Sequence, residues 1–341
     1  MDRQLAVAVV GATGLVGETM VSVLEERGFP VAELFALASN RSLGRSVSFR
    51  GRRYPVDELA GFDFARCELA LFCAGAAVAR QHAARAVAAG CLVIDNSCEF
   101  RGEASVPLVI PEVNPQALER VGRSGLIASP NSTTIELLLT LEPLHEAAQL
   151  TRIHVATYEA VSGAGREAVE ELARQSIAAL SGKGAEAAHG AAKPLAFNCV
   201  PQVDAFEENG FTRGEMQLVS ETRRILDEPR LPVSATAVRV PVFHGHSQVV
   251  HIETARPLSA PEARELLQNA PGVTVLDEHR PGGYPTAATE AANRDTVCVG
   301  RIREDLAPGR GLNLWIVADN LRKGAATNSV QIAETLVRRP I

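Results

Sequence analysis

The stretch Leu5–Gly17, LAVAVVGATGLVG, decides the fold class of this chain. Six apolar residues in a row predict a buried strand, the glycines after them predict a tight turn, and apolar residues at helical spacing in Glu18–Arg27 predict a helix. A glycine turn between a strand and a helix lets the backbone approach a pyrophosphate, which the helix N-terminus also favours. We therefore predict a dinucleotide site; the alternative is a turn whose glycines serve packing alone.

The residues after the second predicted strand indicate which dinucleotide is bound. Domains selective for NAD carry an acidic residue at the end of that strand, where it holds the ribose hydroxyls. Here Glu33 lies at the start of the strand Glu33–Ala38, which is followed by Ser39, Arg41 and Ser42. Hydroxyls and a guanidinium suit a 2′-phosphate, so we predict NADP. The alternative for Arg41 is an ordinary exposed loop arginine.

Further apolar runs alternate with a helix and predict a doubly wound α/β domain with a parallel sheet. After about residue 130 the pattern changes. A helix is expected over Ser132–Leu150, where Pro143 should kink or divide it. The later apolar segments predict a mixed, largely antiparallel sheet. In the parallel sheet the expected strands include Leu69–Cys73 and Leu92–Ile94, with a helix over Ala76–Ala89 between them. In the mixed sheet the expected strands are Ile153–Thr157, Ala235–Val242, Gln248–Ala255, Val297–Ile302 and Leu312–Val317.

Two domains follow from this pattern. We expect a Rossmann-type domain over residues 1–130 and 318–341, to which the helical tail Asn320–Arg339 returns. Residues 131–317 should form an α+β domain, with a loop over Ser181–Lys193. The length of 341 residues agrees with two domains, because single hydrophobic cores stop growing near roughly 250–300 residues.

Composition limits the classes of function. Hydrophobic residues make up 46% and charged residues 22% of the chain, and 34 basic against 40 acidic residues give a net charge of −6. Disorder is excluded for most of the chain, and nucleic acid or a membrane surface is not expected as a partner. Apolar stretches fall short of the roughly 20 residues that span a bilayer, and no secretory signal is evident, so we expect a cytoplasmic protein. The six cysteines lack the spacing of a disulfide framework or a zinc site.

Five longer motifs carry a family resemblance. They are DNSCEFR (95–101), PLVIPEVN (107–114), TYEAVSGAG (157–165), RVPVFHGHS (239–247) and DNLRKGAATN (319–328). With these motifs the chain resembles aspartate-β-semialdehyde dehydrogenases over nearly its whole length. The resemblance implies an NADP domain and an α+β domain that forms the homodimer interface. It also implies NADP-dependent reductive dephosphorylation of β-aspartyl phosphate through a cysteine thioester.

The position of the family's nucleophilic cysteine holds a serine. The family segment Pro-Asn-Cys-Thr/Ser-Thr corresponds here to residues 130–134, with Ser132 in place of cysteine. A thiol of pKa about 8.5 readily becomes a thiolate, whereas a serine hydroxyl needs a general base. An ester on Ser132 would also accept hydride less readily than a thioester. The alternative is a purely structural role, since residues 131–133 suit a helix N-cap and Thr133 with Glu136 fits a capping box.

The resemblance implies roles for the other pocket residues. Arg101 matches the arginine for the substrate phosphate, Arg239 the arginine for the α-carboxylate, and His246 the general acid/base.

Three other positions depart from the family. Glu159 replaces a glutamine, while Gly214 and Gln217 replace a glutamate for the substrate ammonium and a lysine for its phosphate. An acyl phosphate should therefore bind more weakly, because each charge-assisted contact contributes about 1.5–3 kcal/mol.

The candidate residues fall into three groups. They are Ser132, His246 and Glu159 for catalysis; Arg101, Asn131, Arg239 and Gln217 for the substrate; and Gly11, Thr13, Gly14, Leu15, Val16, Ser39, Arg41, Ser42, Ser162, Gly163 and Asn320 for the cofactor.

Several functional hypotheses stay open at this point. The first is a Usg-like paralogue that binds NADP and has lost or greatly reduced the thioester reaction, as a possible pseudoenzyme or dimeric partner. The second is an NADP-dependent oxidoreductase acting on a different small carboxylic aldehyde, and the third is residual aspartate-semialdehyde dehydrogenase activity. The expected ligand is a small carboxylic aldehyde or an acyl-phosphate-like molecule, and the expected assembly is a homodimer.

Three competing sites have weaker support. A metal could be held by residues around His244 and His246, but no Asp or Cys completes the set, so no metal is expected. A serine hydrolase would pair Ser132 with His246 and Glu159, yet the segment is not a GxSxG elbow. Cys98 could be a displaced nucleophile, but we expect a small buried thiol.

Overall fold

The computed structural model describes residues 4–119, 121–122, 125–183, 193–306 and 311–337. Two compact units are present, residues 1–131 with 324–341 and residues 132–323. The domain boundaries expected near residues 130 and 318 stay a prediction. No helix within the described ranges is long and apolar enough to cross a membrane.

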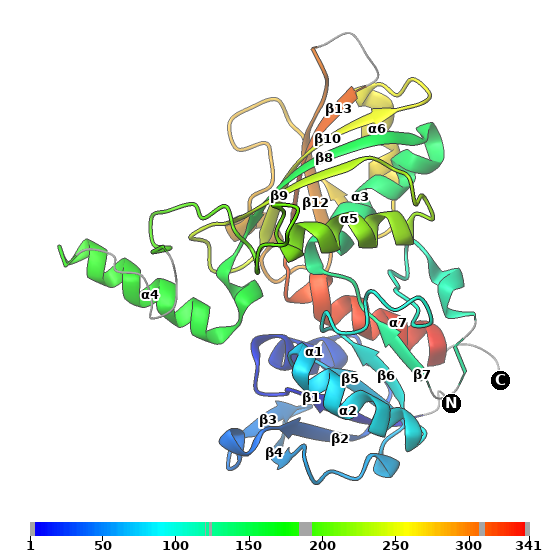
Figure 1. Cartoon of the computed structure of the whole chain (residues 1–341), viewed down its shortest axis with the longest axis vertical. Coiled ribbons are helices and arrows are strands. Elements are labelled where there is room, and N and C mark those ends of the chain that lie inside the picture. The colour runs from blue at the N-terminus through cyan, green and yellow to red at the C-terminus, as the bar shows by residue number, and fades with distance from the viewer. Residues whose placement is uncertain (1–3, 120, 123–124, 184–192, 307–310, 338–341) are drawn as a thin grey trace. The chain divides into compact units, whose positions relative to one another are not determined.

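The first unit contains a seven-stranded sheet in the order β3-β4-β2-β1-β5-β6-β7 (Figure 1). Neighbouring strands are parallel except the edge pair β3–β4. This arrangement confirms the predicted Rossmann-type domain. Its elements are β1 (Leu5–Val10), α1 (Leu15–Glu26), β2 (Val31–Ala38), β3 (Ser46–Phe49), β4 (Arg52–Glu58), β5 (Leu69–Phe72), α2 (Ala76–Ala88), β6 (Leu92–Asp95), β7 (Gly125–Ala128) and α7 (Asn328–Val337).

Strand β1 is apolar throughout because both of its faces are buried. Val7 and Val9 belong to one core cluster with residues of α1 and α7, while Ala8 and Val10 belong to another with residues of α2. With parallel strands paired on each side, every residue of β1 except Ala6 is buried. The glycine turn therefore follows the carboxyl end of a central strand, where open α/β sheets bind ligands.

The second unit contains a six-stranded sheet in the order β11-β12-β13-β10-β8-β9. Strand β10 is antiparallel to β8 and β13, and β13 to β12, while β8–β9 and β11–β12 are parallel. The sheet is mixed and largely antiparallel, as predicted. Its elements are α3 (Ser132–Ala148), β8 (Leu150–Glu159), α4 (Arg166–Leu180), α5 (Arg213–Ile225), β9 (Val233–Arg239), β10 (His246–Thr254), α6 (Ala260–Asn269), β11 (Val273–Val275), β12 (Val297–Glu304) and β13 (Gly311–Ala318).

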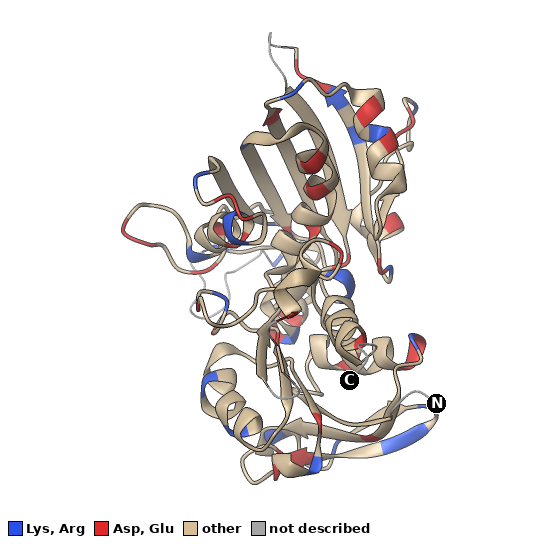
Figure 2. Ribbon diagram, turned by 90° about the vertical axis from the view of Figure 1, so that its right-hand side faces the viewer, with Lys and Arg blue, Asp and Glu red and all other residues tan. Residues whose placement is uncertain are grey.

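The two faces of this sheet differ. Helices α3, α5 and α6 pack against it, and on the covered face Gln248 donates from Nε2 to the carbonyl oxygen of Thr133 in α3 (3.0 Å). On the opposite face Val249 is 37% exposed although it lies in a central strand. The rings of Tyr158 and Trp315 lie 5.9 Å apart on the strands beside it. The strands of this sheet are mostly tan in Figure 2, with charged residues near their ends.

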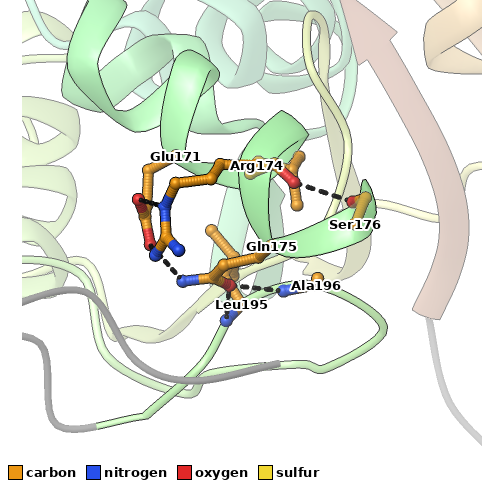
Figure 3. A network of polar contacts seen from close by, with 7 residues as sticks. Glu171, Arg174, Gln175, Ser176, Leu195 and Ala196 are labelled. Atoms are coloured by element: carbon orange, nitrogen blue, oxygen red, sulfur yellow. Dashed lines mark hydrogen bonds and ion pairs between the residues drawn. The ribbon is translucent and has the colours of Figure 1, made fainter. Parts of the chain in front are cut away.

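Helix α4 holds the chain segment that contains Leu195 and Ala196 (Figure 3). Buried Gln175 accepts at Oε1 from the backbone N–H groups of Leu195 (2.8 Å) and Ala196 (3.0 Å). Its Nε2 donates to Glu171 (2.7 Å), which also pairs with Arg174. Most of the predicted loop Ser181–Lys193, residues 184–192, lies outside the described residues.

One prediction about helices is corrected. Of the two outcomes expected at Pro143, a division of α3 does not occur, because Leu141 and Leu144 on either side of it are both buried and hold the two parts in one packed helix. The predicted helical tail Asn320–Arg339 is helical from Arg322, where a π-helical turn over Arg322–Thr327 precedes α7, and its last two residues lie outside the described ranges.

Helices α4, α5 and α6 had no sequence-based prediction. Two of them carry a signal that could have found them, since Thr212 with Glu215 and Ser259 with Glu262 form complete capping boxes.

Candidate active site

The glycine turn of the first unit brings two backbone segments into close contact. Gly11 has φ +84°, and a Cβ atom on it would lie 3.0 Å from the carbonyl group of Cys73. A Cβ atom on Gly17 would lie 2.1 Å from the carbonyl oxygen of Gly11, so only glycine lets α1 begin this close to the turn. The backbone N–H groups of Gly11 and Ala12 donate to the carbonyl oxygen of Leu37 (2.8 and 3.1 Å), which fixes the turn to β2.

The backbone N–H groups at the start of helix α1 can donate to a ligand. Gly14 is its N-cap, and no side chain of the described residues caps the helix there. The first-turn N–H groups, together with the positive end of the helix dipole, favour a bound anion such as a pyrophosphate. These features fit a dinucleotide at this turn.

A cavity of about 530 Å³ lies over the turn. Of the predicted cofactor residues, Gly11, Thr13, Gly14, Ser39 and Ser42 line it, whereas Leu15, Val16 and Arg41 are not part of its lining. Sequence reasoning missed the remaining wall, which includes Asn40, Glu58, Leu59, Val78, Gln81 and His82.

The register of the sheet explains one missed residue. Strand β4 runs parallel to β2 with Glu58 opposite Ala38, so Glu58 ends beside the carboxyl end of β2. Strand β2 itself has no acidic residue at this end, since Glu33 lies near its start. A neighbouring strand can supply an acidic group to the same cavity.

Arg101 and Asn131 both belong to the first unit. Arg101 donates from Nε to the carbonyl oxygen of Ser129 (2.9 Å) and from Nη2 to that of Asn96 (2.7 Å). These carbonyl groups follow the carboxyl ends of β7 and β6, so the guanidinium is fixed at the edge of the sheet where the parallel strands end.

Three candidates of the second unit meet at one end of its sheet. Glu159 and Arg239 are the last residues of the parallel strands β8 and β9 and lie opposite each other in the register. Arg239 Nη1 is 3.5 Å from Glu159 Oε2 and donates to the carbonyl oxygen of Ala160 (2.8 Å). His246 begins β10, and its Nδ1 accepts from the backbone N–H of Ala160 (3.0 Å).

Burial and charge set the ionisation of these groups. Burial raises the pKa of the Glu159 carboxyl, although Arg239 and a hydrogen bond from Thr157 Oγ1 (3.0 Å) oppose that shift. Burial, together with the charge of Arg239, lowers the pKa of His246 to about 3. The imidazole is therefore neutral at pH 7. Since Nδ1 accepts a hydrogen bond, we assign the proton to Nε2.

Gly163 closes one side of this cluster. A Cβ atom on it would lie 3.2 Å from Arg239 Nη1 and 3.4 Å from His246 Nε2, so both groups converge on its bare backbone. The neighbouring Ser162 hydroxyl hydrogen-bonds to Asn320 (3.1–3.2 Å), which also accepts from the N–H of Gly245 (3.0 Å). Asn320 thus holds together the two loops that carry Gly163 and His246.

Ser132 is the first residue of α3, which places Thr133 inside the helix. The suggested capping box is therefore not formed. One turn further on, fully buried Glu136 accepts at Oε2 from Gln248 Nε2 (3.1 Å), and burial raises the pKa of Glu136 well above its ordinary value.

Helix α5 carries Gly214 and Gln217, two of the positions where the resemblance predicts a departure from the family. A Cβ atom on Gly214 would lie 3.3 Å from the carbonyl oxygen of Val203, so the space of a larger side chain is already occupied. Buried Glu215 accepts from the backbone N–H groups of Thr212 (2.7 Å) and Ala237 (2.8 Å) and joins α5 to β9. Gln217 is half-buried on the same helix.

The competing sites gain no support from this geometry. Glu159 bonds to Thr157 and Arg239, and His246 Nδ1 bonds to a backbone N–H, so a serine hydrolase triad is not assembled. Cys98 is exposed, which corrects the expectation of a buried thiol. Within the described residues no group of three His, Cys, Asp or Glu side chains could hold a metal ion.

Comparison with known proteins decides the family. The family model "Semialdehyde dehydrogenase, NAD binding domain" matches residues 6–121, and "Semialdehyde dehydrogenase, dimerisation domain" matches residues 141–323. An aspartate-semialdehyde dehydrogenase of Legionella pneumophila is 51% identical over 99% of this chain and 97% of its own. The chain belongs to the aspartate-semialdehyde dehydrogenase family.

Other members of the aspartate-semialdehyde dehydrogenase family agree with this assignment. The enzyme of Bacillus subtilis is 45% identical over 98% of each chain. The crystal structure of aspartate semialdehyde dehydrogenase II from Vibrio cholerae has a TM-score of 0.96, 45% identity, and covers 99% of this chain and 100% of its own. The same Vibrio enzyme has a structure described as complexed with ASA, with the same similarity. The family's two-domain fold, with an NAD binding and a dimerisation domain, is thereby confirmed.

Proposed function

We propose that this chain is a Usg-like member of the aspartate-semialdehyde dehydrogenase family, which binds NADP and whose thioester-based reaction is lost or greatly reduced. One observation carries the proposal: the position that the resemblance gives to the nucleophile holds Ser132. The state of the candidate base His246 agrees with it. In the assigned tautomer Nε2 carries the proton and Nδ1 is occupied by Ala160. A serine hydroxyl without a base is a poor nucleophile, and an oxygen ester is a poorer hydride acceptor than a thioester.

The first unit fits the dinucleotide. Gly11, Thr13 and Gly14 would hold the pyrophosphate beside the start of α1, and Ser39 and Ser42 line the cavity at the end of β2. Arg41 is exposed in the same 3-10 turn and would meet a 2′-phosphate. When bound, the nicotinamide supplies or accepts hydride. The resemblance adds Leu15, Val16, Ser162, Gly163 and Asn320 as further cofactor contacts.

The substrate residues keep part of the family pattern. The resemblance assigns Arg101 and Arg239 to the anionic ends of a small aldehyde or acyl phosphate, with Asn131 and Gln217 as polar neighbours. The described Vibrio complex with ASA supports a ligand of this size. The open sheet face around Val249 supports a homodimer, since the matched region is a dimerisation domain.

A second candidate function rests on His246. A neutral imidazole that donates from Nε2 can polarise a carbonyl oxygen. The chain could then reduce a different small carboxylic aldehyde directly, without an acyl-enzyme on Ser132.

The nucleophile can be tested by Ser132→Cys. The wild type should show little NADP-linked turnover of L-aspartate β-semialdehyde with phosphate at the NADPH absorbance, and the variant should raise the rate at least tenfold, because a thiolate forms without full base help. The exposed residue Ser181 offers the matched control Ser181→Cys, which should change nothing. Wild-type turnover equal to that of Ser132→Cys would overturn the role given to the serine. A screen of other carboxylic aldehydes tests the second candidate.

The cofactor claim has its own measurement. Calorimetric titration of the folded wild type with NADP should give a saturable isotherm with one site per chain. Absence of binding by NADP and by NAD would reject the dinucleotide site.

A further inference from the structure

Glu159 and Arg239 form an ion pair in the cluster of the second unit that also contains His246. Among the described residues of this cluster, they are the one pair of opposite charges that face each other. Arg239 Nη1 lies 3.5 Å from Glu159 Oε2, and both side chains are nearly buried, with 15% and 11% exposed. The register of β8 and β9 holds their backbones opposite each other, so the pairing does not depend on a flexible loop.

Both partners are fixed by further bonds. Thr157 Oγ1 holds the other carboxyl oxygen of Glu159 (3.0 Å), and the Ala160 carbonyl group holds Arg239 Nη1 (2.8 Å). Neither side chain can leave the pair without losing a second partner. A buried group that loses its hydrogen bond pays the full cost of desolvation.

Burial raises the pKa of Glu159, but the guanidinium of Arg239 3.5 Å away favours the ionised carboxylate. A ligand carboxylate that approached Arg239 would therefore meet an existing carboxylate. The arginine is already matched in charge, and the incoming anion would lie close to Glu159 in a place with little water to screen the repulsion. His246 adds no positive charge, since its ring is neutral at pH 7. An uncharged head group can still accept from the guanidinium without this repulsion.

We propose that the carboxylate of Glu159 pairs with Arg239 in the way that a ligand carboxylate would. The second-unit site then selects ligands with an uncharged carbonyl head group, such as an amide, over free carboxylates. This inference rests on the proposed function only in taking Arg239 as the group that meets the ligand head. It makes Glu159 a specificity-determining residue. It also disfavours the small carboxylic aldehyde of the second candidate function.

The test compares butyrate with butyramide, which share a shape and differ in charge. Dissociation constants are measured by ligand-observed NMR titration of the full chain at pH 7.5. In the wild type, butyrate should bind no more tightly than butyramide. In Glu159→Gln, butyrate should bind at least tenfold more tightly, while the constant for butyramide changes less than twofold.

Two further variants test whether the tighter binding of butyrate in Glu159→Gln depends on Arg239. Arg239→Gln added to Glu159→Gln should abolish the tighter binding of butyrate. Glu170→Gln makes the same chemical change at an exposed position of α4 in the same unit and should leave both constants unchanged.

The outcomes separate this inference from the proposed function. Wild-type protein that binds butyrate more tightly than butyramide overturns the inference without any variant, as does an unchanged ratio in folded Glu159→Gln. Failure to bind NADP rejects the cofactor claim and leaves the butyrate comparison valid. If Glu159→Gln does not fold, the wild-type ratio still decides.

Discussion

At the residue scale, His246 shows how one hydrogen bond restricts chemistry. A backbone N–H that points at Nδ1 fixes the tautomer, and burial beside Arg239 keeps the ring neutral. The side chain that the family resemblance assigns as acid/base is thus a hydrogen-bond donor at Nε2 in the resting site. This state suits carbonyl polarisation better than activation of a hydroxyl group.

The same burial predicts a pH dependence of stability. The pKa of His246 is about 3 in the folded protein and about 6.5 when unfolded, so unfolding takes up a proton between these values. This contribution is present above pH 6.5 and is lost as the pH falls toward 3, with a slope of up to about 1.4 kcal/mol per pH unit. Raised pKa values of Glu136 and Glu159 act with the opposite sign.

The histidine contribution can be isolated by His246→Gln. Urea unfolding between pH 6 and 4.5 should show a slope smaller by about 1 kcal/mol per pH unit than that of the wild type. His279→Gln, at an exposed histidine, should keep the wild-type slope. Equal slopes for the wild type and His246→Gln would contradict a neutral buried ring.

At the element scale, α3 carries Ser132 at its start and Pro143 in its interior. The proline cannot donate to the helix, yet buried leucines on both sides keep the helix continuous. Local propensity is outweighed here by packing of the apolar face against the sheet.

Replacing this proline should stabilise the protein. Pro143→Ala restores a helical hydrogen bond, which outweighs the added freedom of the unfolded chain, and we expect the free energy of unfolding to rise by about 1–2 kcal/mol. Pro261→Ala is the matched control, because Pro261 lies in the first turn of α6, where no bond is lost. Urea unfolding measures both, and a destabilised Pro143→Ala would show that the proline ring itself supports the packing.

At the scale of the whole molecule, the open sheet face of the second unit needs a partner. Val249 is exposed in a central strand between the strands that carry Tyr158 and Trp315. The apolar patch that Val249 forms with Tyr158 and Trp315 on this face is typical of an interface between subunits. We expect a dimer of twice 36.3 kDa, about 73 kDa, in analytical ultracentrifugation.

A charge on this face should weaken the dimer. Val249→Lys places an ammonium group in the interface and should shift the sedimenting species toward the monomer at micromolar concentration. Leu43→Lys, at an exposed leucine of the first unit, should leave the dimer intact. A dimer unaffected by Val249→Lys would place the interface elsewhere.

The sequence by itself determined the fold class and the family. Continuous apolar strands, the glycine turn and the long motifs are local patterns, and the glycines of the turn are required by backbone contacts within a few residues. The serine at position 132 is likewise visible without coordinates, and only the resemblance of its surrounding segment places it at the family's nucleophile position.

Only the tertiary structure decided which groups meet. The sequence suggests Glu159 as a helper of His246, but the parallel register of β8 and β9 pairs it with Arg239, 80 positions along the chain. The same holds for Glu58, which reaches the cofactor cavity from β4, and for the backbone N–H that fixes His246. Strand order and register join residues that are distant in sequence, and burial then sets their charge. Neither property can be read from local spacing.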